Sequence, residues 1–189
     1  MLSETPFSKL LETDRITLEP LTVAHAAELF PVLADRRIYR FMPDDPPFSI
    51  AALAERYRRL ESRRSPDGSQ QWLNWAIRRR DDLQCVGCLQ ATVYQGGTAD
   101  FAFVLGSLFW GLGLAREASV PVLRMLFAEL GITCVFATAD RRNLRSSALL
   151  VHLGFVKVEP AFYPHGDVLD SDDAFRLAKS QIVETGRRS

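Results

Sequence analysis

The segment FWGLGLAREA, residues 109–118, places two glycines and an alanine between an apolar run and a long stretch with helical spacing. Small residues let a backbone come close to a ligand. The first N–H groups of a helix have no partner within the helix, and its dipole favours anions at that end. The segment therefore predicts a helix start that holds a phosphate or pyrophosphate, although a strand–helix turn that simply needs glycine fits the same residues.

A dinucleotide site is one alternative for this segment. GLGLAR, residues 111–116, reads G-x-G-x-x with Arg116 in the third glycine position, and Asp140 ends the next expected strand at nearly the right distance. Arg116 would crowd the close helix–strand contact, and the motif follows several strands instead of opening the fold. Too little chain follows Asp140 for a doubly wound sheet, which disfavours this alternative.

Cys85 and Cys88 have the spacing of half a zinc site. They lie in a run with strand character, where residues three apart point to opposite faces. Further ligands would have to come from Cys134 and three scattered histidines. We therefore expect buried thiols and no metal.

The elements that must position these residues follow in order along the chain. Strands are expected at 15–21, 71–80, 85–94, 100–106, 134–140, 155–162 and 172–178, and helices at 23–36, 49–63, from the glycine motif to about 130, and at 143–153. Ser49 and Asn143 are expected N-caps, and Gly131 and Gly154 helix stops. This order predicts one mixed α/β domain over residues 1–178, with a loose tail at 179–189.

The composition points to an ordinary globular protein. Lys plus Arg and Asp plus Glu number 23 each, so neither nucleic acid nor an anionic membrane is an expected partner. No apolar run approaches the roughly 20 residues that span a bilayer, and the first residues lack a secretory signal. We expect a cytoplasmic protein, either a monomer or a homodimer.

Two motifs resemble one known family. Residues 110–118 match W-G-x-G-x-A-x-E-A, and residues 143–155 match N-x-x-S followed by L-G-F. Together they are similar to the GNAT superfamily of N-acetyltransferases, in particular its RimJ/RimL-like branch, which includes ribosomal-protein N-terminal acetyltransferases. The resemblance covers roughly residues 12 to 160.

The resemblance implies a fold and a co-substrate. The fold is a mixed α/β GNAT fold, whose central, mostly antiparallel sheet is splayed at the acyl-CoA site and flanked by helices. Acetyl-CoA is the implied co-substrate, with no metal. Its pyrophosphate and pantetheine are expected on Phe103, Val104, Leu105, Trp110, Gly111, Leu112, Gly113, Leu114, Ala115, Arg116 and Asn143.

The resemblance also implies an acid and a base. Many relatives place an acidic tyrosine where this chain has Leu150, whereas the RimL-like branch uses a serine, here Ser146. Asp100 is the base candidate by family position. Ser146 could equally be an ordinary first-turn serine, and Asp100 a strand-end carboxylate in solvent. Glu117 is expected to be structural.

Charged runs and one proline add further expectations. Arg116 and the run 141–145 are candidates for the 3′-phosphate of CoA, whereas the arginine runs 58–64 and 77–80 are expected to be solvated. The acidic loops 43–47 and 167–173 border the acceptor side in relatives, or are ordinary polar loops. Prolines inside two expected helices, Pro31 and Pro121, are expected to kink or end them.

The resulting prediction is an N-acetyltransferase that moves an acetyl group from acetyl-CoA to a primary amine. The acceptor is a protein N-terminus or a small molecule. The alternative is a GNAT-like domain that binds acyl-CoA without catalysis, as a sensor or scaffold.

Overall fold

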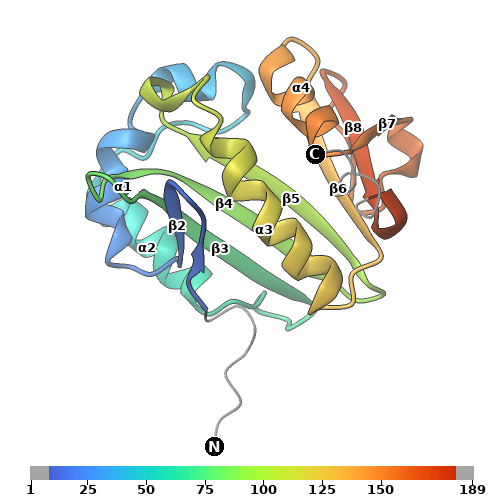
Figure 1. Cartoon of the computed structure of the whole chain (residues 1–189), viewed down its shortest axis with the longest axis horizontal. Helices are drawn as coiled ribbons and strands as arrows, with labels where there is room; N and C mark the ends of the chain where they lie inside the picture. Colours follow the sequence, from blue (N-terminus) through green and yellow to red (C-terminus); the bar gives the residue numbers. More distant parts are fainter. Residues whose placement is uncertain (1–8, 182–189) are drawn as a thin grey trace, which may run out of the picture.

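The computed structural model describes residues 9–181, and its eight strands form one sheet (Figure 1). The strands are β1 (Leu11–Glu12), β2 (Ile16–Pro20), β3 (Gln70–Arg79), β4 (Cys85–Tyr94), β5 (Thr98–Leu105), β6 (Cys134–Asp140), β7 (Val156–Val158) and β8 (Asp172–Ala178). Their order in the sheet is β1-β2-β3-β4-β5-β6-β8-β7. Every neighbouring pair is antiparallel except β5–β6, so the mostly antiparallel sheet is confirmed.

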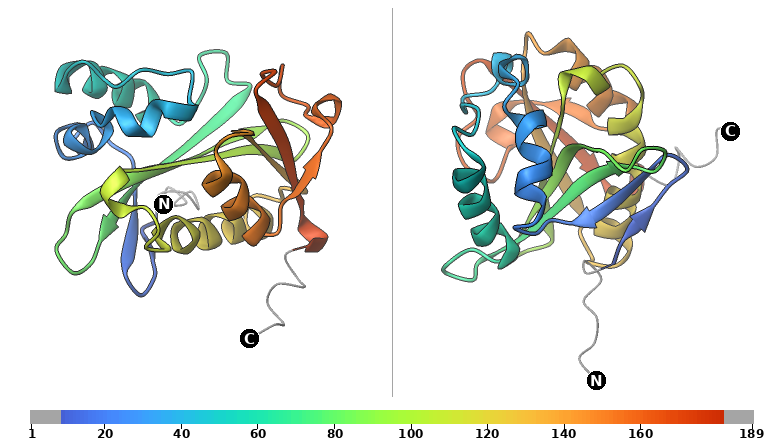
Figure 2. Two further views of the ribbon diagram at one scale, coloured as in Figure 1. Left: turned by 90° about the horizontal axis from the view of Figure 1, so that it is seen from above. Right: turned by 90° about the vertical axis from the view of Figure 1, so that its left-hand side faces the viewer.

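Helices cover both faces of the sheet (Figure 2). The α-helices are α1 (His25–Leu33), α2 (Ile50–Glu61), α3 (Leu114–Ala128) and α4 (Leu144–His152), and the 3-10 helices are η2 (Arg36–Phe41), η3 (Ser107–Phe109) and η4 (Pro160–Phe162). Helices α1 and α2 pack on one face, and α3 and α4 on the other, which we call the α3 face. The expected α/β layering is confirmed.

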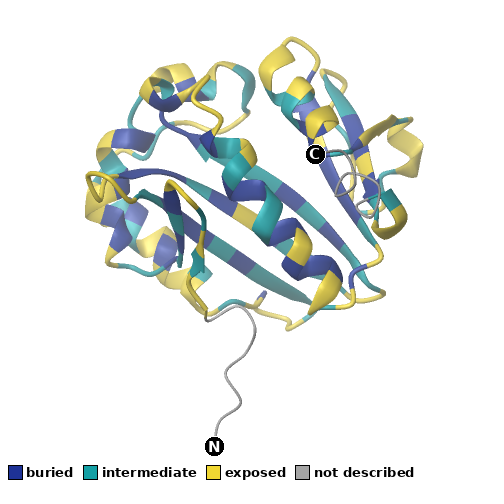
Figure 3. Ribbon diagram, viewed as in Figure 1, coloured by how far each residue is buried: buried dark blue, intermediate teal, exposed yellow. Residues whose placement is uncertain are grey.

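Each face has its own apolar core. Val122 and Leu126 of α3 pack with Phe101 of β5, whereas Leu29 of α1 and Leu53 of α2 pack on the opposite face. Buried residues alternate with partly exposed ones along the central strands (Figure 3), as expected where successive side chains point to opposite faces. The parity of a residue along β5 therefore decides which core it joins.

The expected N-caps are present. Ser49 Oγ accepts a hydrogen bond from Ala52 N at 3.1 Å, and Asn143 Oδ1 accepts one from Ser146 N at 3.2 Å. These bonds satisfy donors that the first helical turn leaves free. Local sequence therefore determines the starts of α2 and α4.

Neither proline interrupts its helix. Helix α1 continues two residues beyond Pro31, and α3 runs through Pro121 to Ala128. A proline removes the bond to the carbonyl four residues earlier, and its ring crowds that same carbonyl. For Pro121 that carbonyl belongs to Glu117, which lies beyond the glycine motif, so the start of α3 forms without hindrance.

The prediction that Cys85 and Cys88 point to opposite faces is wrong. The register of β4 against β3 shifts between Ile77 and Arg78, so that Val86 is an extra, bulged residue. Val86 and Leu89, also three apart, both pack on the α3 face. A bulge reverses the alternation of side chains, and it puts both cysteines on the α1–α2 face.

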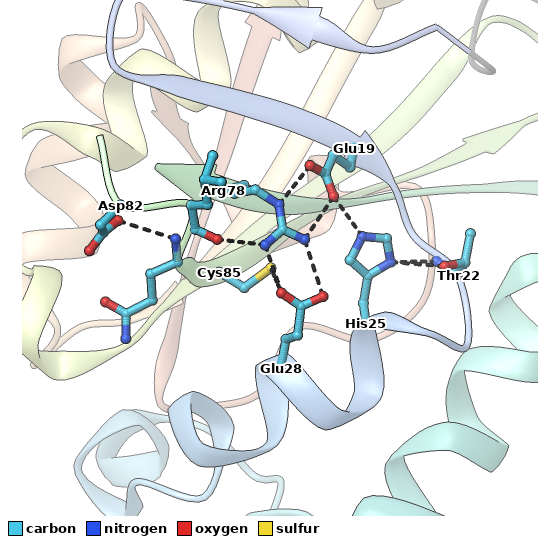
Figure 4. A network of polar contacts seen from close by, with 9 residues as sticks. Glu19, Thr22, His25, Glu28, Arg78, Asp82 and Cys85 are labelled. Atoms are coloured by element: carbon cyan, nitrogen blue, oxygen red, sulfur yellow. Dashed lines mark hydrogen bonds and ion pairs between the residues drawn. The ribbon is translucent and has the colours of Figure 1, made fainter. Parts of the chain in front are cut away.

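Arg78 is not part of a solvated face. Its guanidinium lies 2.7 Å from Glu19 and 2.7 Å from Glu28, and its side chain is 16% exposed (Figure 4). His25 Nε2 lies 2.9 Å from the same Glu19 carboxylate, and Thr22 N donates to His25 Nδ1. This cluster connects β2 and β3 to α1. The arginine run alone does not indicate these partners, because they lie far away in the sequence.

The two ends of the chain are only partly described. Of the expected loose tail, residues 179–181 are described, and Ala178 N donates to Gln181 Oε1 at 2.7 Å. The remainder of that tail lies outside the described residues. Within residues 9–181, the helices are all too short or too polar to cross a membrane.

Candidate functional site

The sheet opens between β5 and β6. These parallel strands pair only from Thr98 to Asp100 and from Cys134 to Phe136. Beyond this vertex β5 continues to Leu105 against β4, while β6 continues to Asp140 against β8 (Figure 1). The edges that face each other, at 101–105 and 137–140, have no strand partner among residues 9–181. The predicted splay is confirmed.

The open edge of β5 offers fewer backbone groups than expected. The carbonyl oxygen of Val104 points toward β4. It lies so close to Gly87 of that strand that a Cβ built on the glycine would be only 2.2 Å away. Alternation along the strand then directs the carbonyls of Phe103 and Leu105 toward the splay. Trp110 Nε1 already donates to Leu105 O at 2.9 Å, so Phe103 retains the freer backbone of the two.

The glycine motif forms the turn that starts α3. Gly111 and Gly113 have φ of +78° and +79°, a region that residues with a Cβ avoid. The first backbone bond of the helix runs from Glu117 N to Gly113 O at 3.1 Å. Among the described residues, the N–H groups of 112–116 donate no hydrogen bond. They form a donor cluster of the kind that binds anions at helix starts.

The Glu117 side chain connects this turn to the segment between β1 and β2. Its carboxylate accepts hydrogen bonds from Thr13 Oγ1 at 2.6 Å and from Arg15 N at 2.9 Å, and it pairs with the Arg15 guanidinium at 2.6 Å. Arg15 Nη1 also donates to Leu112 O at 3.0 Å. Burial acts to raise the pKa of Glu117, but these partners outweigh it and hold the pKa below its usual value. The contacts support the expected structural role.

The arginines expected near CoA divide into two groups. Arg141 pairs with Asp173 at 3.2 Å, and Arg142 pairs with Asp140 at 2.6 Å, which lowers the pKa of Asp140 to about 2. Arg116 is exposed and makes no ion pair among the described residues. Together with Arg145, whose guanidinium lies over the Trp110 ring, it remains available to a ligand phosphate.

Ser146 lies in the first turn of α4. Its backbone N–H bonds to the Asn143 cap, while its Oγ has no hydrogen-bond partner among the described residues. Leu150, in the position where many relatives have tyrosine, is 1% exposed and belongs to the core of the α3 face. Of these two positions on α4, only Ser146 carries a hydroxyl.

Asp100 is not a free carboxylate in solvent. Tyr94 OH donates to its Oδ2 at 2.8 Å, and His165 Nδ1 lies 2.7 Å from its Oδ1. Thr98 Oγ1 lies 2.8 Å from His165 Nε2. Asp100 is the last residue of β5 to pair with β6, so this cluster sits at the vertex of the splay. Because side chains alternate along β5 and Phe101 points to the α3 face, the Asp100 side chain points to the α1–α2 face. Ser146 belongs to α4, which covers the α3 face.

Tyr94 and His165 were not identified from the sequence. His165 lies in the loop between β7 and β8, 65 residues from Asp100, and its neighbours in sequence, Pro164 and Gly166, indicate only a turn. Tyr94 reads as an ordinary strand residue. Neither position carries a local signal, because the cluster exists only once β5 and this loop are brought together.

A shallow cavity of about 390 Å³ lies beside this cluster. Its lining is polar and aromatic and contains Ser69, Tyr94, Gln95, Thr98, Pro164 and His165. Within residues 9–181, no group of three or more histidine, cysteine, aspartate or glutamate residues could hold a metal ion. The side chains of the cluster offer hydroxyls, an imidazole and a carboxylate.

A splayed sheet beside a glycine turn at a helix start is the arrangement of a GNAT acetyltransferase. The chain matches the acetyltransferase (GNAT) domain over residues 15–156, and it belongs to this family. It is 22% identical over 168 residues to the uncharacterized N-acetyltransferase YoaA of Bacillus subtilis, covering 86% of this chain and 93% of that protein.

Solved structures share the fold. The GNAT-family acetyltransferase from Bacillus anthracis superposes with a TM-score of 0.73 at 15% identity, covering 91% of this chain and 99% of the other. The ribosomal-protein-S5-alanine acetyltransferase from Vibrio fischeri has a TM-score of 0.73 at 16% identity, with coverages of 90% and 96%. At such identities the likeness extends to the fold alone.

Proposed function

We propose that this protein transfers an acetyl group from acetyl-CoA to a primary amine by direct attack. The observation that carries the proposal is the splay between β5 and β6, next to the unpaired N–H groups at the start of α3. The donor groups suit a pyrophosphate, and the open edge of β5 suits the amide groups of pantetheine. An acyl carrier held in this way brings its thioester toward the vertex.

The residues of the vertex suit the proton transfers of this reaction. A primary amine reaches the site as an ammonium ion, so one proton must leave before its nitrogen can attack the thioester carbon. We assign that step to the cluster at the vertex that contains Asp100. The nitrogen of the tetrahedral intermediate then loses a second proton, and the CoA thiolate gains one as the C–S bond breaks. Ser146 Oγ can relay this proton and end the cycle unchanged.

The motif points to the RimJ/RimL-like branch and to two classes of acceptor. Trp110 and Glu117 match the glycine motif of that branch, and Asn143 and Ser146 match its second motif. A protein N-terminus and a small-molecule amine both present the same attacking nitrogen. The branch includes acetyltransferases of ribosomal proteins, which makes peptides with a free N-terminus the first acceptors to test.

The test measures CoA thiol release from acetyl-CoA across a panel of peptides and small amines, with CoA affinity measured separately by calorimetry. We expect CoA binding, and turnover with at least one class of amine. The Ser146→Ala variant should release thiol about 100-fold more slowly, at the low end for general acid catalysis, with CoA affinity unchanged. A protein that binds CoA but acetylates no amine, with Ser146→Ala behaving identically, would instead be the non-catalytic acyl-CoA sensor.

A further inference from the structure

His165 is held in place by contacts from several elements. Its side chain is only 6% exposed. The ring stacks on Tyr94 with 3.7 Å between centroids, and the rings of Phe136 and Tyr163 meet it edge-on at 5.6 and 5.7 Å. A side chain with so little freedom loses little further entropy when it acts on a substrate.

The partners of the ring define its tautomer. Asp100 Oδ1 is the acceptor in its contact with the ring, which assigns the proton of the neutral ring to His165 Nδ1. The lone pair is then on Nε2, where the Thr98 hydroxyl donates at 2.8 Å. Hydroxyl, imidazole and carboxylate stand in the order that makes histidine a general base in hydrolases.

Asp100 itself is less suited to receive the proton. One of its oxygens accepts from His165 and the other from Tyr94, so both are engaged in holding other side chains of the cluster. A carboxylate in this arrangement orients the imidazole and stabilises its protonated form. Among the described residues, the only donor to His165 Nε2 is the Thr98 hydroxyl, which can rotate away when an ammonium approaches.

The surroundings of Nε2 suit an incoming ammonium. His165 and Thr98 both line the 390 Å³ cavity, and none of its six lining residues is a lysine or an arginine. The titratable groups that face the ring are Tyr94, Tyr163 and Asp100. Burial and the nearby Asp100 raise the pKa of both tyrosines, so neither competes as a base near neutral pH.

We propose that His165 Nε2 takes the proton from the acceptor ammonium, with Asp100 as its positioning residue and the cavity as the entrance for a primary amine. The inference rests on the proposed acetyl transfer and names the base within it. The ammonium gives one proton to Nε2, and Asp100 stabilises the imidazolium. The freed amine attacks the thioester, its second proton passes to the thiolate, and the imidazolium returns its proton to water.

The test compares the full-length wild type, His165→Gln and His152→Gln in the thiol-release assay across a pH series. His152 is an exposed histidine on α4 and serves as the matched control. We expect kcat/KM of His165→Gln to fall at least about 100-fold and to lose its rise with pH, since glutamine cannot take the proton. CoA affinity should be unchanged. A His165→Gln protein that keeps the wild-type rate and pH profile would overturn the proposal.

Two further measurements separate a catalytic role from a structural one. Added imidazole should restore part of the activity of His165→Ala, which a folding defect would not allow. Asp100→Asn should displace the pH profile and not merely lower the rate, because asparagine does not enforce the tautomer; an undisplaced profile would contradict its positioning role. If the wild type binds CoA but acetylates no amine, the proposed function fails as well. If wild type and His165→Gln acetylate equally, only the role of His165 fails.

Discussion

The guanidinium of Arg145 lies over the indole of Trp110, with 5.6 Å between Cζ and the ring centroid. Trp110 follows β5, whereas Arg145 belongs to the first turn of α4, directly after β6. The contact therefore spans the mouth of the splay. Because the same indole donates to Leu105 O, one side chain connects both sides of the opening.

Removing this guanidinium should weaken CoA binding. We expect Arg145→Ala to raise the Kd for CoA about two- to fivefold, because an exposed guanidinium that pairs with a ligand phosphate contributes about 0.5–1 kcal/mol. Calorimetric titration with CoA measures it. Arg124→Ala removes an exposed charge from the middle of α3 and should leave Kd unchanged. Equal losses in both variants would mean that only net charge matters.

The turn at Gly113 should not tolerate a side chain. Its φ of +79° costs a residue with a Cβ about 1–2 kcal/mol, and the added carbon would lie 3.4 Å from Arg15 Nη2. We expect Gly113→Ala to lower both thermal stability and CoA affinity. Gly68→Ala is the matched control, since Gly68 has φ +73° with nothing within 4 Å. It should lose similar stability and bind CoA normally.

The Glu117 carboxylate should stabilise the fold at neutral pH and not in acid. Its pKa is lower in the folded protein than in the unfolded chain, so its contribution is complete above the unfolded value of 4.5 and disappears as the pH falls through the folded pKa. We expect Glu117→Gln to lose about 1–3 kcal/mol at pH 7.

Urea unfolding at several pH values measures this contribution. The difference in unfolding free energy between wild type and Glu117→Gln should decrease as the pH falls below 4.5. Glu129→Gln, at the exposed end of α3, should match the wild type throughout. If this difference in unfolding free energy stayed constant with pH, the charge of Glu117 would make no contribution to stability.

The Arg78 cluster should be costly to break. Arg78→Met leaves the Glu19 and Glu28 carboxylates side by side without their cation, and we expect a loss of about 2–4 kcal/mol, less than for a fully buried pair. The exposed pair of Arg58 and Glu55 offers the control, since Arg58→Met should cost under about 1 kcal/mol. Chemical denaturation at pH 7 gives both values, and similar losses would contradict the importance of the cluster.

Acidification should reduce the effect of Arg78→Met. Hydrogen bonds from Arg78 lower the pKa of Glu19 and Glu28 in the wild type. Once both carboxylates are protonated, the variant no longer holds two unpaired charges. The difference in unfolding free energy should therefore shrink as the pH falls below 4.5.

The sequence predicts best what depends on neighbours along the chain. Apolar and alternating runs predicted β2 to β6 and β8, but not β1, and the strand expected at 155–162 ends at Val158. The caps Ser49 and Asn143 were predicted because their hydrogen bonds close within three residues. The splay after Asp100 was predicted from a resemblance and not from alternation. The strands and caps are each encoded within one element, whereas the splay was inferred from two motifs together.

The remainder could not be predicted, because it depends on contacts between distant segments. The bulge at Val86 leaves the alternation of polar and apolar letters unchanged while it reverses the faces of Cys85 and Cys88. Arg78 and Arg79 are adjacent in one run of arginines, yet only Arg78 meets two carboxylates from β2 and α1. His165 reaches Asp100 only when the β7–β8 loop folds over β5.

The hydrogen bonds from Thr13 and Arg15 to Glu117 affect the order in which the chain folds as it is synthesised. Its hydrogen bonds join residues 102 to 104 positions apart, so the N-terminal hairpin leaves the ribosome long before its partner does. Contacts of such separation form late, because the intervening loop must first be closed. The turn at the start of α3 is thus expected to be fixed near the end of folding, only after α3 has been synthesised.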